Sequence, residues 1–186
     1  MHNVEFIIPA YDMPSQLMMC VGSIMSQTAN NWKVTVVCDG EFKGLNKILQ
    51  YFEGEDKIRF HVMEGGPHND WGHTPRKWGL ENATEEWVIM TGHDNYYFPP
   101  FLDAFNKAID DKTHFVFCDM YHNYADYVYE TSQLRKVVFP NGSWRMEGLD
   151  IGAFASRREM AVQIPFNTEL HWADGLFAAM YWEKFC

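Results

Sequence analysis

The sequence VEFIIPAYD, residues 4–12, contains the first strong structural signal of the chain. Its largely apolar run over residues 4–8 is closed by Pro9, which predicts a buried β-strand ending there. A helix is predicted to follow, through about Gln27 and capped by Ser15, because apolar residues then recur on one helical stripe. A strand followed at once by an amphipathic helix is typical of proteins built on a parallel sheet.

Strands and helices alternate along the rest of the chain. Further strands are predicted over residues 33–38, 58–63, 87–91, 115–120 and 151–155. Further helices are predicted over residues 44–52, 75–82, 101–109, 157–162 and 174–185. Residues 120–144 are polar, aromatic and β-leaning, which predicts a hairpin or meander. The pattern predicts one α/β domain over residues 1–186, with a mostly parallel central sheet, helices on both faces and a small β-rich second half.

Composition limits the classes of function. The 186 residues are 47% hydrophobic, enough for a sizeable core, and their net charge of −10 disfavours DNA or RNA as a partner. The four cysteines are widely spaced, which predicts neither a zinc site nor a disulfide framework. No signal peptide and no apolar run of about 20 residues is visible, so a soluble, cytoplasmic protein without a membrane span is expected.

Polar residues cluster where the predicted strands end. Four such stretches, residues 9–12, 38–41, 65–77 and 92–95, are rich in Gly, Asp, His or Asn. Ligands of open parallel sheets bind beyond the carboxyl ends of the strands. We therefore predict that all four stretches line one pocket.

Five short phrases occur in order through the first half of the chain. They are FIIPAYD at 6–12, SIMSQT at 23–28, WKVTVVCDG at 32–40, RKWGL at 76–80, and Ala83-Thr84 followed by the strand at 87–91. Together they resemble the family 2 glycosyltransferases, which have the GT-A fold, a Rossmann-like nucleotide-diphospho-sugar transferase domain. The resemblance covers residues 4 to 105 well and 150 to 180 loosely. It implies a nucleotide-binding half over about 1–95 and an acceptor-binding half over about 96–186.

The resemblance implies a donor site for a UDP-sugar, and the expected donor is UDP-glucose or UDP-galactose. Asp39 is expected to accept hydrogen bonds from the uracil base, and Arg76 to grip phosphate oxygens. Lys77 departs from the family pattern, in which Asn is usual. His68 and His73 are expected on a loop over the donor. The remaining implied donor residues are Pro9, Ala10, Tyr11, Asp12, Gly40, His93, Asp94 and Asn95.

The metal motif of the family, Asp-x-Asp after the fourth strand, is altered in this chain. Gly92 stands in place of the first Asp, and Asp94 in place of the second. One carboxylate with a diphosphate and waters can still hold Mn²⁺ or Mg²⁺. Imidazole is also an acceptable ligand of Mn²⁺, so His171 is a further candidate. Asp94 and His171 are thus the predicted metal ligands.

An inverting sugar transfer needs a base that takes the proton of the acceptor hydroxyl. The resemblance places this base near the start of a late helix, where Asp174 follows Ala173 in the place of the usual Glu. The other interpretation of Asp174 is a helix N-cap. Candidate acceptor-binding residues are Trp144, Asp150 and Trp172, whose rings or carboxylate suit a sugar.

The sequence thus predicts a metal-dependent, inverting hexosyltransferase that acts on a hydroxyl of a carbohydrate-type acceptor. A catalytically inactive nucleotide-sugar-binding or carbohydrate-binding relative is the main alternative, favoured by Gly92. A dinucleotide-dependent oxidoreductase is disfavoured because no G-x-G-x-x-G follows the first strand. A carbohydrate-binding module and a nucleotidyltransferase are weaker alternatives.

Overall fold

The computed structural model describes the backbone of residues 1–118, 120–123, 134–137 and 150–186, and the side chains of residues 1–118 and 150–186. Its strands are β1 (Val4–Ala10), β2 (Trp32–Cys38), β3 (Ile58–Val62), β4 (Trp87–Met90), β5 (Phe115–Phe117), β6 (Met120–Asn123), β7 (Leu134–Val137) and β8 (Phe154–Arg157). Its helices are α1 (Pro14–Met25), α2 (Leu45–Tyr51), α3 (His73–Glu81), α4 (Phe101–Ala108), a 3-10 turn (Ile151–Ala153), α5 (Arg158–Ala161) and α6 (Ala173–Phe185).

Six strands form the main sheet in the order β3-β2-β1-β4-β8-β5. β1 pairs in parallel with both β2 and β4, and β2 pairs in parallel with β3. β8 is antiparallel to both of its neighbours, β4 and β5. Every residue of β1 is buried, as its place in the middle of a covered parallel sheet requires. The mostly parallel sheet predicted from the sequence is confirmed.

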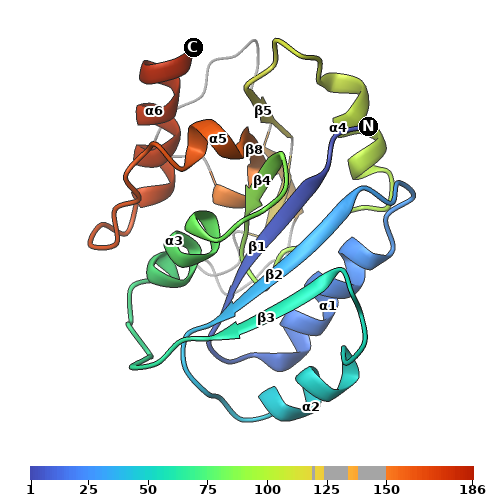
Figure 1. Cartoon of the computed structure of the whole chain (residues 1–186), viewed down its shortest axis with the longest axis vertical. Coiled ribbons are helices and arrows are strands. Elements are labelled where there is room, and N and C mark those ends of the chain that lie inside the picture. The colour runs from blue at the N-terminus through green and yellow to red at the C-terminus, as the bar shows by residue number, and fades with distance from the viewer. Residues whose placement is uncertain (119, 124–133, 138–149) are drawn as a thin grey trace.

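Helices cover both faces of this sheet (Figure 1). One core cluster joins the sheet to α1, α2 and α4, through Leu17, Leu45 and Leu102 among others. A second cluster on the other face joins it to α3, α5 and α6, and includes Leu80 and Phe177. The two-sided packing confirms the predicted architecture. Among the described residues, no helix combines the length and the apolar character needed to cross a membrane.

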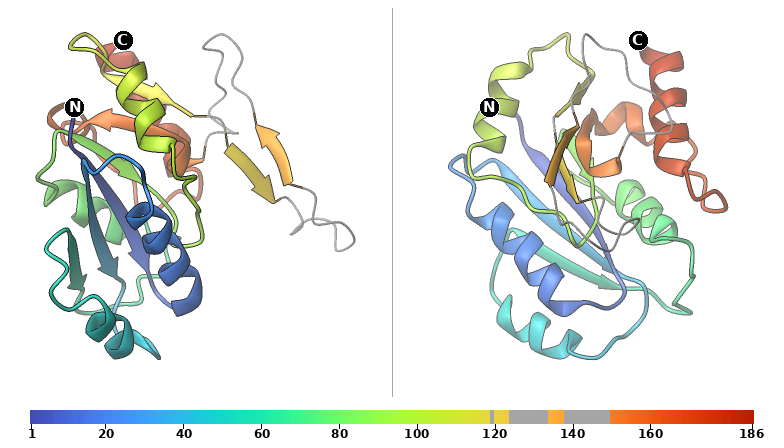
Figure 2. Two further views of the ribbon diagram at one scale, coloured as in Figure 1. Left: turned by 90° about the vertical axis from the view of Figure 1, so that its right-hand side faces the viewer. Right: turned by 180° about the vertical axis from the view of Figure 1, so that it is seen from behind.

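β6 and β7 form a separate antiparallel pair that stands apart from the main sheet (Figure 2). This pair agrees with the hairpin predicted over residues 120–144, of which the remainder lies outside the described residues. The strand predicted over residues 151–155 is shifted: residues Ile151–Ala153 form the 3-10 turn, and β8 begins only at Phe154. Asp150 accepts a hydrogen bond from the Gly152 amide and so stabilises this turn.

The start of α1 differs from the prediction. Ser15 does not cap the helix, which begins one residue earlier at Pro14 after Met13 in a left-handed conformation. Proline suits a first helical position because its missing N–H would have no partner there. The loop predicted to hold His73 is also shorter than expected, since His73 is the first residue of α3 and is buried.

Candidate active site

A cavity of about 350 Å³ lies at the ends of β1, β2 and β4. Residues from all four polar stretches that follow the predicted strands line this cavity, which confirms the prediction that these stretches form one pocket. The lining residues are Pro9, Ala10, Tyr11, Asp12, Asp39, Asn69, Asp70, Trp71, Gly72, Pro75, Arg76, Gly92, His93 and Asp94.

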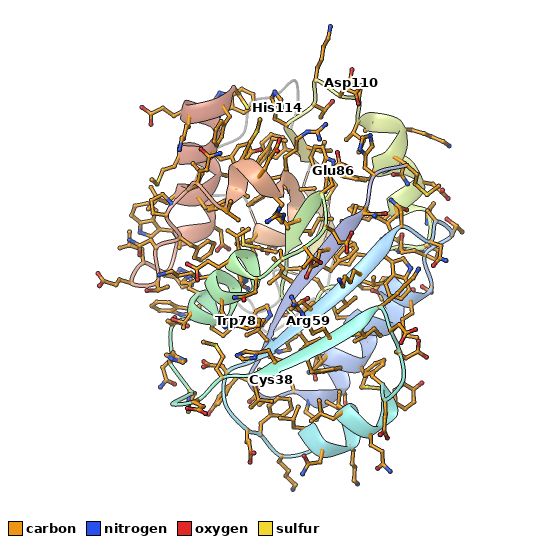
Figure 3. The ribbon with its side chains drawn as sticks, viewed as in Figure 1. Cys38, Arg59, Trp78, Glu86, Asp110 and His114 are labelled. Atoms are coloured by element: carbon orange, nitrogen blue, oxygen red, sulfur yellow. The ribbon has the colours of Figure 1, made fainter. Side chains whose placement is uncertain are left out.

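Asp39 forms a buried part of the cavity wall, directly after Cys38 at the end of β2 (Figure 3). Its carboxylate accepts a hydrogen bond from the backbone N–H of His68 at 2.9 Å and pairs with the ring of the same residue. The chain at Gly66 passes so close that a Cβ there would lie 2.6 Å from the Asp39 carbonyl. Asp39 therefore holds the loop between β3 and α3 against the sheet, while a carboxylate retains further lone pairs for a ligand.

Arg76 is a buried cation in the wall of the cavity. Its Nε donates to the Thr91 carbonyl at 3.3 Å, and its Nη1 donates to the Trp71 carbonyl at 2.9 Å. Burial lowers the pKa of Arg76, but a guanidinium stays charged under all ordinary conditions. Four carboxylates oppose the effect of burial and are attracted to this cation: Asp174, Asp150, Asp94 and Asp70. Arg76 thus balances the charge of an acidic site.

Trp71 is a lining residue that sequence reasoning did not single out. Its backbone adopts φ 59°, a left-handed conformation that is rare for a bulky side chain. The Arg76 bond to its carbonyl holds this conformation, and the side chain is 57% exposed. The ring of His171, from a distant part of the chain, packs edge-on against it with centroids 5.1 Å apart. The only sequence signal for Trp71 is its place within residues 65–77.

Asp94 presents an exposed carboxylate to the cavity. A Cβ at Gly92 would lie 2.5 Å from Asp94 Oδ1, so the surviving carboxylate occupies the space that a side chain at position 92 would need. Among the residues that the structure describes, no group of three or more His, Cys, Asp or Glu is arranged to hold a metal ion. Asp94 fits a hard cation that takes its other ligands from a diphosphate and water. The neighbouring His93 also lines the cavity, and its buried Nε2 has no hydrogen-bond partner within the described residues.

Asp174 lies in the first turn of α6, whose N-cap is Trp172, so the N-cap interpretation of Asp174 is wrong. Burial raises the pKa of Asp174 to about 6, although the attraction of Arg76 acts in the opposite direction. The Asp150 carboxylate raises the pKa further, while the Ile151 amide and His171 lower it. The carboxyl group is thus placed beside the cation of the cavity wall and poised to change its charge near neutral pH.

The remaining predicted residues that the structure describes lie outside the cavity lining. The Asn95 amide donates to Thr91 Oγ1 at 2.8 Å, and a Cβ at Gly40 would lie 3.3 Å from the carbonyl carbon of Gly66. Lys77 is exposed on α3, and Trp172 is 51% exposed at the start of α6. Trp144 lies outside the described residues.

The model of the family described as "Glycosyl transferase family 2" matches residues 5–168. The chain therefore belongs to glycosyl transferase family 2, as its five phrases predicted. An uncharacterized glycosyltransferase of Rickettsia typhi is 26% identical over 155 residues, which are 81% of this chain and 45% of that protein. The chain spans less than half the length of the curated relatives it matches.

Solved structures share the fold of this chain. S. aureus TarS superposes with a TM-score of 0.77 at 19% identity, over 96% of this chain and 55% of that one. TarS has also been solved with UDP and with UDP-GlcNAc. The mannosyltransferase PcManGT of Pyrobaculum calidifontis, solved with GDP-Man and Mn²⁺, superposes with a TM-score of 0.73 at 16% identity, over 97% of this chain and 52% of that one. The fold is thus the GT-A fold.

Proposed function

We propose that this chain transfers a hexose from a UDP-sugar to a hydroxyl group of a carbohydrate-type acceptor, with inversion at the anomeric carbon. Membership of the family supports the reaction class, and the TarS complexes with UDP and UDP-GlcNAc support a uridine donor. UDP-glucose and UDP-galactose are the first donors to test. The GDP-Man complex of PcManGT makes GDP the natural control.

The observation that carries the proposal is the raised pKa of the buried Asp174 carboxyl group. A general base works best when its pKa lies near the working pH, and burial brings the pKa of Asp174 to about 6. In the proposed step Asp174 takes the proton of the acceptor hydroxyl as its oxygen bonds to the anomeric carbon. The bond from that carbon to the diphosphate oxygen breaks at the same time, and the diphosphate leaves with the electron pair.

The donor is proposed to occupy the 350 Å³ cavity. The end of β1 and Asp39 would contact the base and ribose, and Arg76 would supply positive charge near the diphosphate. Mn²⁺ or Mg²⁺ bound at Asp94 would offset the negative charge that develops on the departing diphosphate. Without a cation, the four carboxylates around Arg76 would repel the diphosphate of the donor. A cation at Asp94 would reduce this repulsion.

The alternative function is a nucleotide-sugar-binding or carbohydrate-binding relative without catalysis. It is favoured by Gly92, which leaves Asp94 as a single carboxylate in the place of the family's two. Slow hydrolysis of the donor separates the two proposals, because an active transferase passes some sugar to water while an inactive relative leaves the donor intact.

The test is a calorimetric titration of the chain with UDP and with GDP, in Mn²⁺ and again in EDTA. Binding of UDP in preference to GDP, lost in EDTA, would support the donor site and the metal. UDP-glucose and UDP-galactose would then be assayed for release of UDP. Equal binding in Mn²⁺ and in EDTA would overturn the proposed metal role of Asp94. Failure to bind either nucleotide would overturn the transferase proposal.

A further inference from the structure

His73 and Asp174 bring toward each other two buried polar atoms that form no hydrogen bond to a described residue. The His73 side chain is fully enclosed, and neither ring nitrogen has a hydrogen-bond partner within the described residues. Asp174 Oδ1 is likewise buried without a hydrogen bond to any described residue. His73 Nδ1 lies 4.0 Å from Asp174 Oδ1. Leaving a polar group buried and unpaired destabilises a fold, so two such atoms in direct opposition call for an explanation.

The position of His73 is fixed by its surroundings. His73 begins α3, and Asp70 accepts hydrogen bonds from the backbone N–H of His73 at 3.1 Å and of Thr74 at 2.8 Å. The ring packs against Phe166, with centroids 5.6 Å apart, and against Trp71 at 6.0 Å. The imidazole is therefore held at the meeting point of the N-terminal ends of α3 and α6 and has no route to solvent.

The charge state of the ring decides what it can donate. Burial and the nearby Arg76 lower the pKa of His73, while Asp70 and the carbonyls of Leu170 and His171 act in the opposite direction. The net lowering leaves the imidazole neutral at pH 7, with one N–H donor and one acceptor nitrogen. Neither ring nitrogen forms a hydrogen bond of ordinary geometry with these carbonyls or with Asp174, but the carboxylate of Asp174, 4.0 Å from Nδ1, is a charged acceptor and would form the stronger bond.

We infer that His73 is a positioning residue for Asp174, donating its Nδ1–H to Asp174 Oδ1. The contact needs a closure of roughly 1 Å, and hydrogen bonds of catalytic groups are often long in free enzymes and tighten with substrate. Because Oδ1 is the buried oxygen and a quarter of the side chain is exposed, the bond would turn the other oxygen toward the acceptor hydroxyl. This catalytic consequence rests on the proposed function; the contact itself does not.

The contact is tested by nuclear magnetic resonance of the ring nitrogens in histidine-labelled protein, with His73→Phe used to assign the signal. A buried carboxylate favours a proton on the nitrogen that faces it, even across 4.0 Å. His73 is expected as the Nδ1–H tautomer in the wild type and as the Nε2–H tautomer in Asp174→Ala. The His61 signal, from a ring stacked on Trp78, should be the same in both proteins. The inference would be overturned if His73 is the Nε2–H tautomer in the wild type, or if its tautomer is the same in wild type and Asp174→Ala.

The catalytic consequence is tested by release of UDP from UDP-glucose in Mn²⁺. His73→Phe keeps the ring packing and removes both nitrogens, and a misplaced base should lower kcat by about 10- to 100-fold at unchanged KM for the donor. His73→Asn retains an N–H donor and should recover most of the loss, while His61→Phe serves as the matched control. Equal activity of His73→Phe and wild type would overturn the positioning role. A wild type that releases no UDP would instead contradict the proposed function, and the tautomer measurement would still decide the contact.

Discussion

Two opposing effects act on the carboxyl group of Asp174, and burial is the larger. Its partner Arg76 is shared among four carboxylates, so no one of them is fully neutralised. An ordinary aspartate pKa near 3.9 in the unfolded chain and about 6 in the folded protein means that the native state binds the proton more tightly. Above pH 6 the ionised carboxylate therefore destabilises the fold, and below pH 4 this effect is absent.

Replacing Asp174 by Asn should separate activity from stability. Turnover of a UDP-sugar is expected to fall on the order of 10²-fold or more, because a base acts mainly in the transition state. The variant should be more stable than wild type at pH 8, by on the order of 1–3 kcal/mol, since the buried charge is removed. Thermal melts at pH 8 and pH 4 check this, with no stabilisation expected at pH 4. Loss of UDP binding in the variant would show instead that Asp174 is structural.

The pH dependence of the rate follows from the same group. The proposed base must be ionised, so kcat should rise with pH through a value of about 6 and level off above it. The terminal phosphate of UDP also titrates at about pH 6, so the affinity for UDP should change with pH, but equally in wild type and Asp174→Asn, because Asp174 lies outside the cavity lining. A rate already constant between pH 5 and pH 8 would contradict the assignment of Asp174 as the base.

Single residues show where sequence reasoning reaches its limit. Asp94 and Asp174 are candidates from the sequence because they occupy places in a family pattern. Trp71 was not, because its exposure depends on a left-handed backbone and a bond from Arg76 that no local pattern encodes. The pairing of His73 with Asp174 joins positions far apart in the chain, so it depends on how α3 and α6 pack.

At the scale of elements, α3 packs very closely against β1. A Cβ at Gly79 would lie 2.3 Å from Ile7 Cγ2 and 3.4 Å from Val37 Cγ2, so glycine lets the helix approach the sheet. This approach holds Arg76, on the same helix, beside the end of β4, where its Nε donates to the Thr91 carbonyl. The position of the site therefore depends on the absence of one side chain.

Gly79→Ala is expected to lower the free energy of unfolding by about 1–3 kcal/mol, since overpacking forces a shift of α3 from the sheet. Gly22→Ala is the matched control. Gly22 lies within α1 with open space around its Cβ position, and alanine should stabilise that helix by about 0.5–1 kcal/mol. Urea unfolding of both variants checks the opposite signs. A Gly79→Ala protein as stable as wild type would show that α3 is not held as closely as the structure indicates.

Elements also differ in how far the sequence determines them. The parallel strands β1, β2 and β4 were predictable because mostly apolar runs mark buried parallel strands. The start of β8 was predicted three residues too early. The position of an antiparallel strand beside β4 depends on its pairing with neighbouring strands and not on its own sequence alone. The start of α1 was missed because Pro14 and the left-handed Met13 determine it in place of a side-chain cap.

In the whole molecule, the cavity joins segments that are distant in sequence. Its lining comes from the ends of β1, β2 and β4 and from the loop and first turn of α3. Arg76 then connects this lining to Asp150 and Asp174 in the last part of the chain. Binding in the cavity should therefore stabilise the folded chain as a unit, because a ligand that binds only the native state adds its binding free energy to the stability.

The UDP–Mn²⁺ complex, at about 100 times its dissociation constant, is expected to add about 2.7 kcal/mol and raise Tm by roughly 5–10 °C. Asp94→Asn should lose most of this shift, because the amide is a weaker ligand for a hard cation. Asp111→Asn removes the same charge from an exposed position outside the cavity and should keep the full shift. Thermal melts with UDP alone, Mn²⁺ alone and both together measure the dependence on metal. If Asp94→Asn and Asp111→Asn respond alike, the cation does not bind at Asp94, and the altered motif has lost its metal role.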